Sequence, residues 1–379
     1  MRAIIIFILL LGISACSTKP VLTSTNDFPW NDALFREEIP TQLISEADIF
    51  KLDDDLEARL SSPSVQNLTT QKRINYFLDL VYSKGVSPFG YYAYDTTPAA
   101  KTWRAKQGNC ISLTVLAYAI GRKLDLPIVM QDVDVPVQFD RRGNVEFLNT
   151  HVNAIILHRD FSFEKESDDK GYLIIDFEPQ MMVLDRGRQL TEKQIVSRFY
   201  NNLGAEFYAK KKYKLAYAYY RQAIMTSPSH FAAYNNLAQL YIQAGDQSQA
   251  EALMRYALQI DNKDPVVLRS LQNLLLSQQR NEEAEKLNKA INASNEQNPH
   301  YWIGLGMYAM DQKDFKKAIS SFEKAQKLAT GFGEIHQNLA TAYFQVGNQV
   351  RAKEELKKFI NILPEHPKSA LYRSKITAR

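Results

Sequence analysis

Residues 197–230 read SRFYNNLGAEFYAKKKYKLAYAYYRQAIMTSPSH, and the pattern of this stretch recurs every 34 positions through the second half of the chain. Leucine returns in step at Leu203, Leu237, Leu271, Leu305 and Leu339, and alanine at Ala216, Ala250, Ala284, Ala318 and Ala352. A fixed period of this length is typical of stacked helical hairpins, each of which buries its apolar face against the next. We therefore predict five helix–turn–helix units within residues 193–366 and a capping helix over 367–379.

Small and aromatic residues accompany these two series at constant offsets. A small residue follows the leucine at Gly204, Ala238 and Gly306, and an aromatic residue comes four positions after the alanine at Tyr220 and Phe322. The pattern resembles the tetratricopeptide repeat, in which small residues let paired helices approach closely. The resemblance implies an all-α solenoid. The third repeat departs from it, because Gln272 replaces the small residue and Asn288 the aromatic one.

Arrays of this family hold peptides and partner proteins, so the resemblance implies a protein or peptide partner on the repeats. The predicted inner face carries side-chain amides at Asn201, Asn202, Asn235, Asn236, Gln239, Gln337 and Asn338. Such amides either clamp a peptide backbone or form a solvated polar surface, and the sequence leaves both interpretations open. The histidines of the array lack metal-ligand spacing and are predicted to be structural; they are His230, His300, His336 and His366.

Composition excludes several classes of protein. Of the 379 residues, 45% are hydrophobic and 23% charged, which is ordinary globular composition and excludes wholesale disorder. The net charge of +4 gives no electrostatic footprint for nucleic acid. Two cysteines are too few for a disulfide-stapled scaffold or a Cys-rich zinc module. The sequence shows no phosphate loop, dinucleotide fingerprint or metal cluster, so we expect no cofactor and no metal.

The first residues have the parts of an export signal. Arg2 precedes an apolar run over residues 3–13, which is too short for a permanent span of roughly 20 residues, and small residues follow it. Ile13-Ser14-Ala15-Cys16 resembles the lipobox of bacterial lipoproteins, which implies cleavage before Cys16 and diacylation of that cysteine. The alternative is an ordinary secretory signal with a chance cysteine.

The lipoprotein interpretation predicts where the protein lies. Residues 1–15 are then the signal peptide, and residues 16–45 are the lipidated cysteine and a tether rich in Ser, Thr, Pro and Asn near its start. Ser17 follows the cysteine, which by resemblance to enterobacterial sorting favours the outer membrane. We expect a protein of the bacterial cell envelope, anchored to the membrane through lipid on Cys16 and facing the periplasm.

Lipidation of Cys16 leaves Cys110 as the one remaining thiol. Cys110 precedes apolar residues at Leu113, Leu116, Ala117, Ile120 and Leu124, whose spacing predicts a helix packed by one face. The cysteine therefore lies at the start of a buried helix. The partial positive charge and the N–H groups of a helix N-terminus favour a thiolate and can hold a developing oxyanion.

Predicted strands follow this helix and bring two further candidates. Residues 128–137 alternate like a strand, residues 150–157 form a second strand that begins near His151, and residues 172–177 form a third that contains Asp176. Adjacent strands lie about 4.8 Å apart, so His151 and Asp176 can meet side by side. A thiol, an imidazole that takes its proton and a carboxylate that orients the imidazole are the groups that cysteine acyl transfer requires.

Residues 100–185 resemble the bacterial transglutaminase-like domains. The resemblance lies in Gly108-Asn109-Cys110 before a helix, in Thr150-His151-Val152 and in Ile175-Asp176-Phe177. It implies an α+β, papain-like domain over residues 46–192, with Cys110, His151 and Asp176 as catalytic residues. Residues 107–113 are also similar to a bacterial branch that joins this domain to tetratricopeptide repeats, much of which has proline in place of the cysteine. Asn153 and Ala154 depart from the aromatic and acidic residues that many members carry there.

Other residues compete for the same roles. His158 is the rival to His151 as base, and Glu178 and Asp132 are the rivals to Asp176 as orienting acid. Gln107 is either a further oxyanion donor or a solvent-exposed loop amide.

Two functions from different classes follow. The first is a lipid-anchored cysteine acyl-transfer enzyme, a peptidase, amidase or transglutaminase-like enzyme whose repeats recruit the substrate protein. The second is a non-catalytic envelope scaffold or assembly factor that acts through its repeats. The intact order of Cys110, His151 and Asp176 favours the first.

Overall fold

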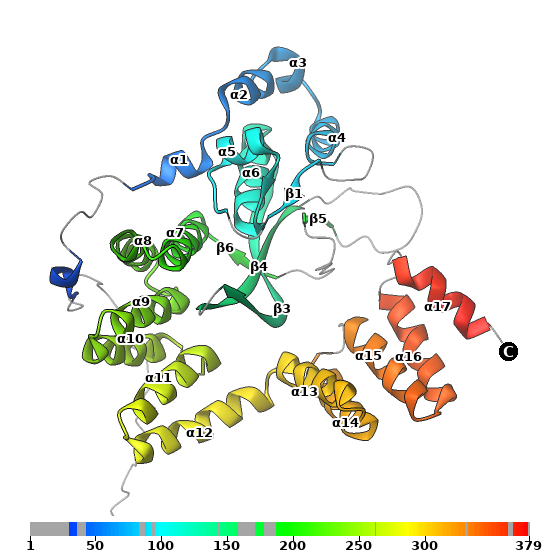
Figure 1. Ribbon diagram of the computed structural model, residues 1–379. Helices are drawn as coiled ribbons and strands as arrows, with labels where there is room; N and C mark the ends of the chain where they lie inside the picture. Colours follow the sequence, from blue (N-terminus) through cyan, green and yellow to red (C-terminus); the bar gives the residue numbers. More distant parts are fainter. Residues whose placement is uncertain are drawn as a thin grey trace, which may run out of the picture. The chain divides into compact units, whose positions relative to one another are not determined.

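The computed structural model describes residues 30–35, 43–82, 88–92, 95–142, 145–157, 171–177, 187–261, 263–329, 333–362 and 367–377 (Figure 1). The signal peptide, Cys16, His158 and Glu178 lie outside these residues. None of the described helices has the length and apolarity that a membrane span requires.

Four α-helices lie within residues 43–82. They are α1 (Glu46–Phe50), α2 (Asp54–Leu60), α3 (Pro63–Gln66) and α4 (Thr70–Val81). Ser45 and Asp53 cap the first two through their side-chain oxygens, and Pro63 occupies the first turn of α3, where its missing N–H costs no hydrogen bond. Three of these helices therefore begin where a side-chain oxygen accepts a free backbone N–H, or where proline has none to satisfy.

Helix α6 (Cys110–Lys123) packs on an antiparallel sheet (Figure 1). The sheet has the order β5-β4-β3-β6, with β3 (Ile128–Arg142), β4 (Val145–Leu157), β5 (Tyr172–Ile175) and β6 (Arg188–Leu190). From Ile111 to Gly121 every residue of α6 is buried, because the sheet covers one face and other helices cover the rest. Thr114 donates its hydroxyl hydrogen to the carbonyl oxygen of Val152, which ties the helix to β4.

The strands are longer than the sequence predicts. β3 and β4 form an extended hairpin, so His151 lies within β4 and not at its start, opposite Val133 of β3. The three-residue β6 is absent from the sequence prediction, since so short a strand has too little alternation to be recognised. β5 is shorter than the predicted strand over 172–177, so Asp176 directly follows it and does not lie within it.

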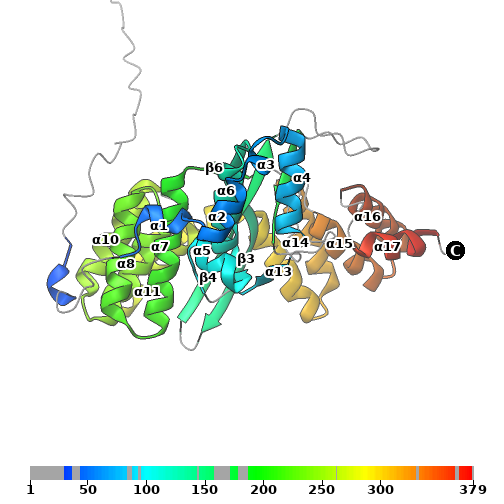
Figure 2. The same ribbon diagram turned by 90° about the horizontal axis from the view of Figure 1, so that it is seen from above.

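Ten helices form the repeat array in five antiparallel pairs (Figure 2). They are α7 (Glu192–Ala209), α8 (Tyr213–Thr226), α9 (Phe231–Gln243), α10 (Gln247–Ile260), α11 (Pro265–Ser277), α12 (Asn281–Glu296), α13 (Pro299–Asp311), α14 (Phe315–Leu328), α15 (Gly333–Gln345) and α16 (Gln349–Ile362). α17 (Pro367–Thr377) packs on α16. Helix α7 also contacts α6, so one helix serves both the first repeat and the mixed region before it.

Glycine lets the two helices of a pair lie close together where an aromatic ring of the second helix packs against the first. A Cβ added at Gly306 of α13 would lie 2.4 Å from the ring of Phe322 in α14, and one added at Gly204 of α7 would lie 2.5 Å from the ring of Tyr220 in α8. Both rings are buried. The small residue after the repeat leucine is therefore needed for close packing.

We expect Gly306→Ala to destabilise the protein by about 2 kcal/mol, because overpacking of a rigid core typically costs 1–3 kcal/mol. Gly304, in the same helix, is the matched control, since a Cβ there meets nothing within 4 Å. Gly304→Ala should raise the free energy of unfolding by about 0.5–1 kcal/mol through helix propensity. Urea unfolding of both variants measures the difference, and equal effects would contradict the packing explanation.

Candidate active site at the start of helix α6

Cys110 is the first residue of α6 and is half-buried. The side-chain oxygen of Asn109 caps the helix by accepting the N–H of Ser112 at 2.9 Å. Gly108 leaves no room for a side chain, since a Cβ there would lie 2.9 Å from Cβ of Ser112. The Gly-Asn-Cys sequence thus supplies a close approach, a helix cap and a thiol in that order.

The structure brings together the three residues that the sequence singles out. His151 Nε2 lies 2.7 Å from Asp176 Oδ2, and the His151 side chain also hydrogen-bonds with Cys110. Because Nε2 faces Asp176, the ring nitrogen left for the thiol is Nδ1. The residues come from three separate elements, the start of α6, the middle of β4 and the end of β5.

The electrostatics of the site favour a charged imidazole. His151 is only 2% exposed, and burial alone would lower the pKa of its imidazole. The hydrogen bonds to Asp176 and Cys110, followed by the electrostatic interactions with the same two residues, outweigh burial and raise the pKa of His151 to about 10. At neutral pH the imidazolium of His151 is therefore held between the carboxylate of Asp176 and the sulfur of Cys110.

Hydrogen bonds from side-chain amides fix the position of the Asp176 carboxylate. Asn153 Nδ2 donates to Asp176 Oδ2 at 2.9 Å, and Gln131 Nε2 donates to Asn153 Oδ1 at 2.8 Å. The backbone N–H of Gly187 donates to Gln131 Oε1 at 2.9 Å. The departure at Asn153 thus has a structural account, since this amide fixes the carboxylate that orients His151.

Aromatic residues anchor the backbone beside Asp176. The Tyr82 hydroxyl donates to the carbonyl oxygen of Asp176 at 2.7 Å, and the Tyr82 ring stacks on Phe177 with centroids 5.9 Å apart. Burial, followed by the charge of Asp176, raises the pKa of Tyr82, so its hydroxyl stays protonated and keeps donating. Sequence reasoning misses this contact because residues 82 and 176 lie far apart along the chain.

The remaining candidates are Asp132 and Gln107, since His158 and Glu178 lie outside the described residues. Asp132 accepts from Arg188 at 2.8 Å and from Arg198 at 2.7 Å, so its carboxylate joins the sheet to α7. Gln107 is exposed in β2 (Gln107–Gly108), which pairs in parallel with β1 (Gly90–Tyr91). Its role as an oxyanion donor remains a prediction. Among the described residues, no group of three or more His, Cys, Asp and Glu side chains is placed to hold a metal ion.

Amides on the array are partly buried. Asn236 Nδ2 donates to Asn201 Oδ1 at 2.9 Å, which joins the first helices of two successive repeats. Asn235 is buried, and within the described part of the chain its amide oxygen accepts no hydrogen bond. A buried acceptor without a donor is unfavourable by about 1–3 kcal/mol.

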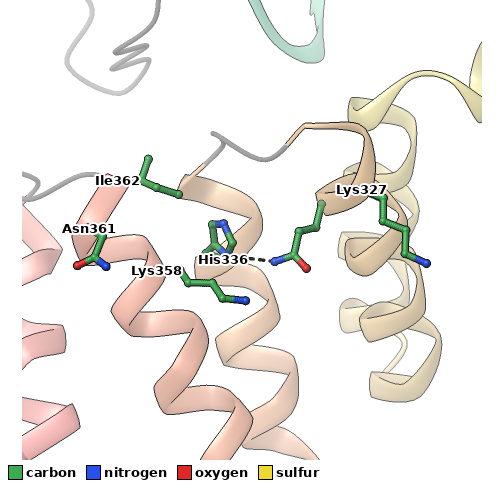
Figure 3. A pocket seen from close by; sticks show the side chains of 6 residues that line it. Lys327, His336, Lys358, Asn361 and Ile362 are labelled. Carbon is green, nitrogen blue, oxygen red and sulfur yellow. Dashed lines mark hydrogen bonds between the residues drawn. The ribbon is translucent and has the colours of Figure 1, made fainter.

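Two array histidines take part in internal hydrogen bonds. His230 Nδ1 lies 2.8 Å from Ser197 Oγ, and burial, followed by the charge of Arg198, lowers the pKa of His230 to about 3. His336 Nδ1 lies 2.6 Å from Glu355 Oε2. Beside His336 a pocket of about 510 Å³ opens between α14, α15 and α16 (Figure 3). In this view Lys358 lies near His336, and Lys327 points away from it.

Comparison with known proteins confirms the tetratricopeptide prediction. Models of the tetratricopeptide repeat match residues 207–255, 244–306 and 299–331. These ranges contain the helices from the end of α7 to α14, so this part of the chain carries tetratricopeptide repeats.

One similar curated protein is the uncharacterized protein ycf37 of Porphyra purpurea. It is 29% identical over 109 residues, which are 28% of this chain and 63% of that relative. The chain thus spans less than two thirds of the relative that it matches.

Several solved structures are similar to part of this chain. YrrB, described as a TPR protein with an unusual peptide-binding site, is 21% identical, with 47% of this chain and 92% of that chain covered and a TM-score of 0.25. A MamA protein is 19% identical, with 47% and 95% covered and a TM-score of 0.25. PilF of Pseudomonas aeruginosa is 18% identical, with 49% and 92% covered and a TM-score of 0.27. Likeness at these TM-scores adds nothing to the repeat assignment, which rests on the family models.

Proposed function

We propose that this protein is a cysteine acyl-transfer enzyme of the cell envelope whose repeat array holds a protein partner or substrate. The observation that carries the enzymatic half is the hydrogen-bonded order of Cys110, His151 and Asp176 at the start of α6. The resemblance of residues 100–185 to the transglutaminase-like domains supports the same roles and a papain-like arrangement.

The residues present account for each step of the reaction. The Cys110 thiolate attacks the carbonyl carbon of an amide, and the new C–S bond forms as the carbonyl electrons move onto oxygen. The C–N bond then breaks, and the His151 imidazolium gives its proton to the departing amine. Water or an amine attacks the thioester while His151 takes a proton from it, and the acyl group leaves Cys110 as an acid or a new amide. Asp176 keeps Nδ1 of His151 aimed at the sulfur throughout.

Acylation by a simple activated ester tests this proposal without knowledge of the natural substrate. Incubation of the chain that starts at Ser17 with p-nitrophenyl acetate should place one acetyl group on Cys110, as seen by intact mass and peptide mapping. We expect turnover to fall at least 100-fold in Cys110→Ala and His151→Ala, because general-base activation is typically worth 10²–10⁴-fold. Acetylation spread over lysines and indifferent to both substitutions would sink the proposal. Adding an amine acceptor then separates transfer from hydrolysis.

The second half of the proposal concerns the repeats. The five helix pairs belong to a family of protein-binding arrays, and the part-buried amides of Asn201 and Asn236 on α7 and α9 are candidate contacts for the backbone of an extended peptide. Should the acylation test fail, a scaffold that works through these repeats is the function that the structure still supports. Site-specific photocrosslinking from position 239 in cells, with position 358 as the comparison, would then identify the partner.

We further propose that Cys16 carries lipid and holds the protein in the outer membrane. The support is the resemblance of residues 13–16 to a lipobox, in a chain with only two cysteines. We expect Cys16→Ser to abolish incorporation of a labelled fatty acid and to release the protein from the membrane fraction. Cys110→Ser is the matched control and should keep both lipid and membrane attachment. Equal labelling of the two variants would rule out the anchor.

A further inference from the structure

Glu206 is a buried carboxylate in the first repeat helix, and its hydrogen bonds lead to the cap of the cysteine helix. We propose that Glu206 is a positioning residue for Cys110: through Thr96 it fixes the orientation of the Asn109 cap, so that the repeat array and the acyl-transfer site form one working unit. The inference rests on the proposed function, because it assigns Glu206 a part in the same site.

The chain of contacts is short and entirely buried. Glu206 Oε1 accepts both the backbone N–H of Thr96, at 2.8 Å, and the Thr96 hydroxyl, at 2.7 Å. Asn109 Nδ2 donates to Thr96 Oγ1 at 2.7 Å, and Asn109 Oδ1 accepts the N–H of Ser112. Glu206 is 7% exposed, and Thr96 and Asn109 are each 3% exposed. Two intervening side chains therefore separate the array from the first turn of α6.

The direction of each hydrogen bond follows from the chemistry of the groups. An ionised carboxylate only accepts, so the Thr96 hydroxyl donates to Glu206 and offers a lone pair to Asn109. The Asn109 NH₂ must then face Thr96, and this leaves its carbonyl oxygen toward Ser112, which is the orientation that a helix cap requires. Rotation of the amide by half a turn would set its NH₂ against the Ser112 N–H. Glu206 thus selects the one amide orientation that caps α6 beside Cys110.

The placement of Glu206 is unfavourable for a residue that only packs. Burial raises the pKa of its carboxyl group, and the hydrogen bonds from Thr96 act against that rise, so the site carries a desolvation cost that packing alone does not require. The loop before α5 (Ala99–Ala105) is fixed a second time next to Thr96, since the N–H of Thr97 donates to Ser112 Oγ at 2.8 Å. The same loop therefore contacts both α7 and the first turn of α6, and a shift of α7 on partner binding would reach the thiol.

The test compares Glu206→Ala with Glu206→Gln by the alkylation rate of Cys110 with iodoacetamide between pH 5 and 9. Both bonds go to one oxygen of Glu206, which glutamine also has, so Glu206→Gln should stay within twofold of the natural protein. Glu206→Ala should react about tenfold more slowly below pH 7, with a pH profile moved toward that of an ordinary thiol. Glu192→Ala is the matched control, because Glu192 lies in the same helix and bonds to Tyr118 instead. It should leave the rate unchanged.

Two substitutions at Thr96 form a second pair of variants, which tests the inference if Glu206→Ala fails to fold. Thr96→Val removes the hydroxyl at constant shape and should reproduce the slow rate, and Thr96→Ser should restore it. Equal rates in Glu206→Ala and the natural protein, or equal loss in Glu206→Gln and Glu206→Ala, would overturn the inference. Failure of the proposed function has a different signature, since His151→Ala would then alkylate like the natural protein. In that case amide hydrogen exchange at Ser112, faster in Thr96→Val than in Thr96→Ser, still decides whether the relay holds the cap.

Discussion

Replacement of His151 by alanine is expected to slow the alkylation of Cys110 at pH 5 by about 30-fold or more. An ordinary thiol, with a pKa near 8.5, is only about 0.03% ionised at pH 5. A sulfur paired with the His151 imidazolium stays ionised there, and this gain of about 3,000-fold exceeds the roughly 10- to 100-fold loss of nucleophilicity that accompanies a more acidic thiol. The rate of the natural protein should therefore form a plateau through pH 6, and that of His151→Ala should fall tenfold per pH unit below about pH 8.

His230→Gln is the control for the loss of a buried histidine. Its imidazole lies in the array, and burial lowers its pKa to about 3, the opposite direction from His151. Alkylation of Cys110 should be unaffected in this variant. A natural protein that reacts only above pH 8, or only when unfolded, would show that the three residues form a structural contact and no activated pair.

The charge on His151 also determines how its contribution to stability changes with pH. A raised pKa in the folded state means that the contribution of His151 is complete below its ordinary value near 6.5 and is lost as pH rises through about 10. The difference in unfolding free energy between the natural protein and His151→Gln should therefore shrink from pH 6.5 to pH 10. A difference that grows over this range would contradict the charged imidazole.

The sequence predicts some parts of this molecule because they leave a pattern in one dimension. The repeat array is of this kind, since every helix pair carries the leucine and the alanine that return at intervals of 34 residues. The three site residues can also be predicted from the sequence, because the helix that begins at Cys110 and the strands next to His151 and Asp176 follow one another along the chain. The position of His151 inside β4 was missed, since the length of a hairpin depends on pairing that alternation does not reveal.

The groups that hold the site are beyond sequence reasoning for a physical reason. Glu206 lies 110 residues from Thr96, and Gly187 lies 56 residues from Gln131. Hydrogen bonds of this kind follow from how elements stack and have no periodicity of their own. A polar residue in an otherwise buried position is the one available signal, and Glu206, on the α7 helix that packs against α6, is an example.

Gln131 is the strongest case of such a hidden support, and Gln131→Leu should lower the free energy of unfolding by about 3 kcal/mol. The side chain is fully buried, and its replacement leaves the buried Asn153 Oδ1 and the half-buried Gly187 N–H without their partner. Each buried group left unsatisfied costs about 1–3 kcal/mol. Gln189 is the matched control, because it pairs with Gln131 across β3 and β6 but is exposed, so Gln189→Leu should change stability by less than about 0.5 kcal/mol. Urea unfolding followed by circular dichroism provides the measurement.

Adding Asn153→Leu to Gln131→Leu separates stability from chemistry. The double variant removes both ends of the Gln131–Asn153 hydrogen bond, so it should lose clearly less stability than the sum of the two single variants. It also removes the amide that donates to Asp176, which leaves His151 less firmly oriented toward Cys110. The double variant should therefore lose less stability than the two single variants together, whereas its alkylation of Cys110 at pH 5 should be slower than that of the natural protein. A smaller loss of stability together with a natural alkylation rate would show that the network acts only on folding. A loss of stability equal to the sum of the single variants would show that the two amides contribute independently.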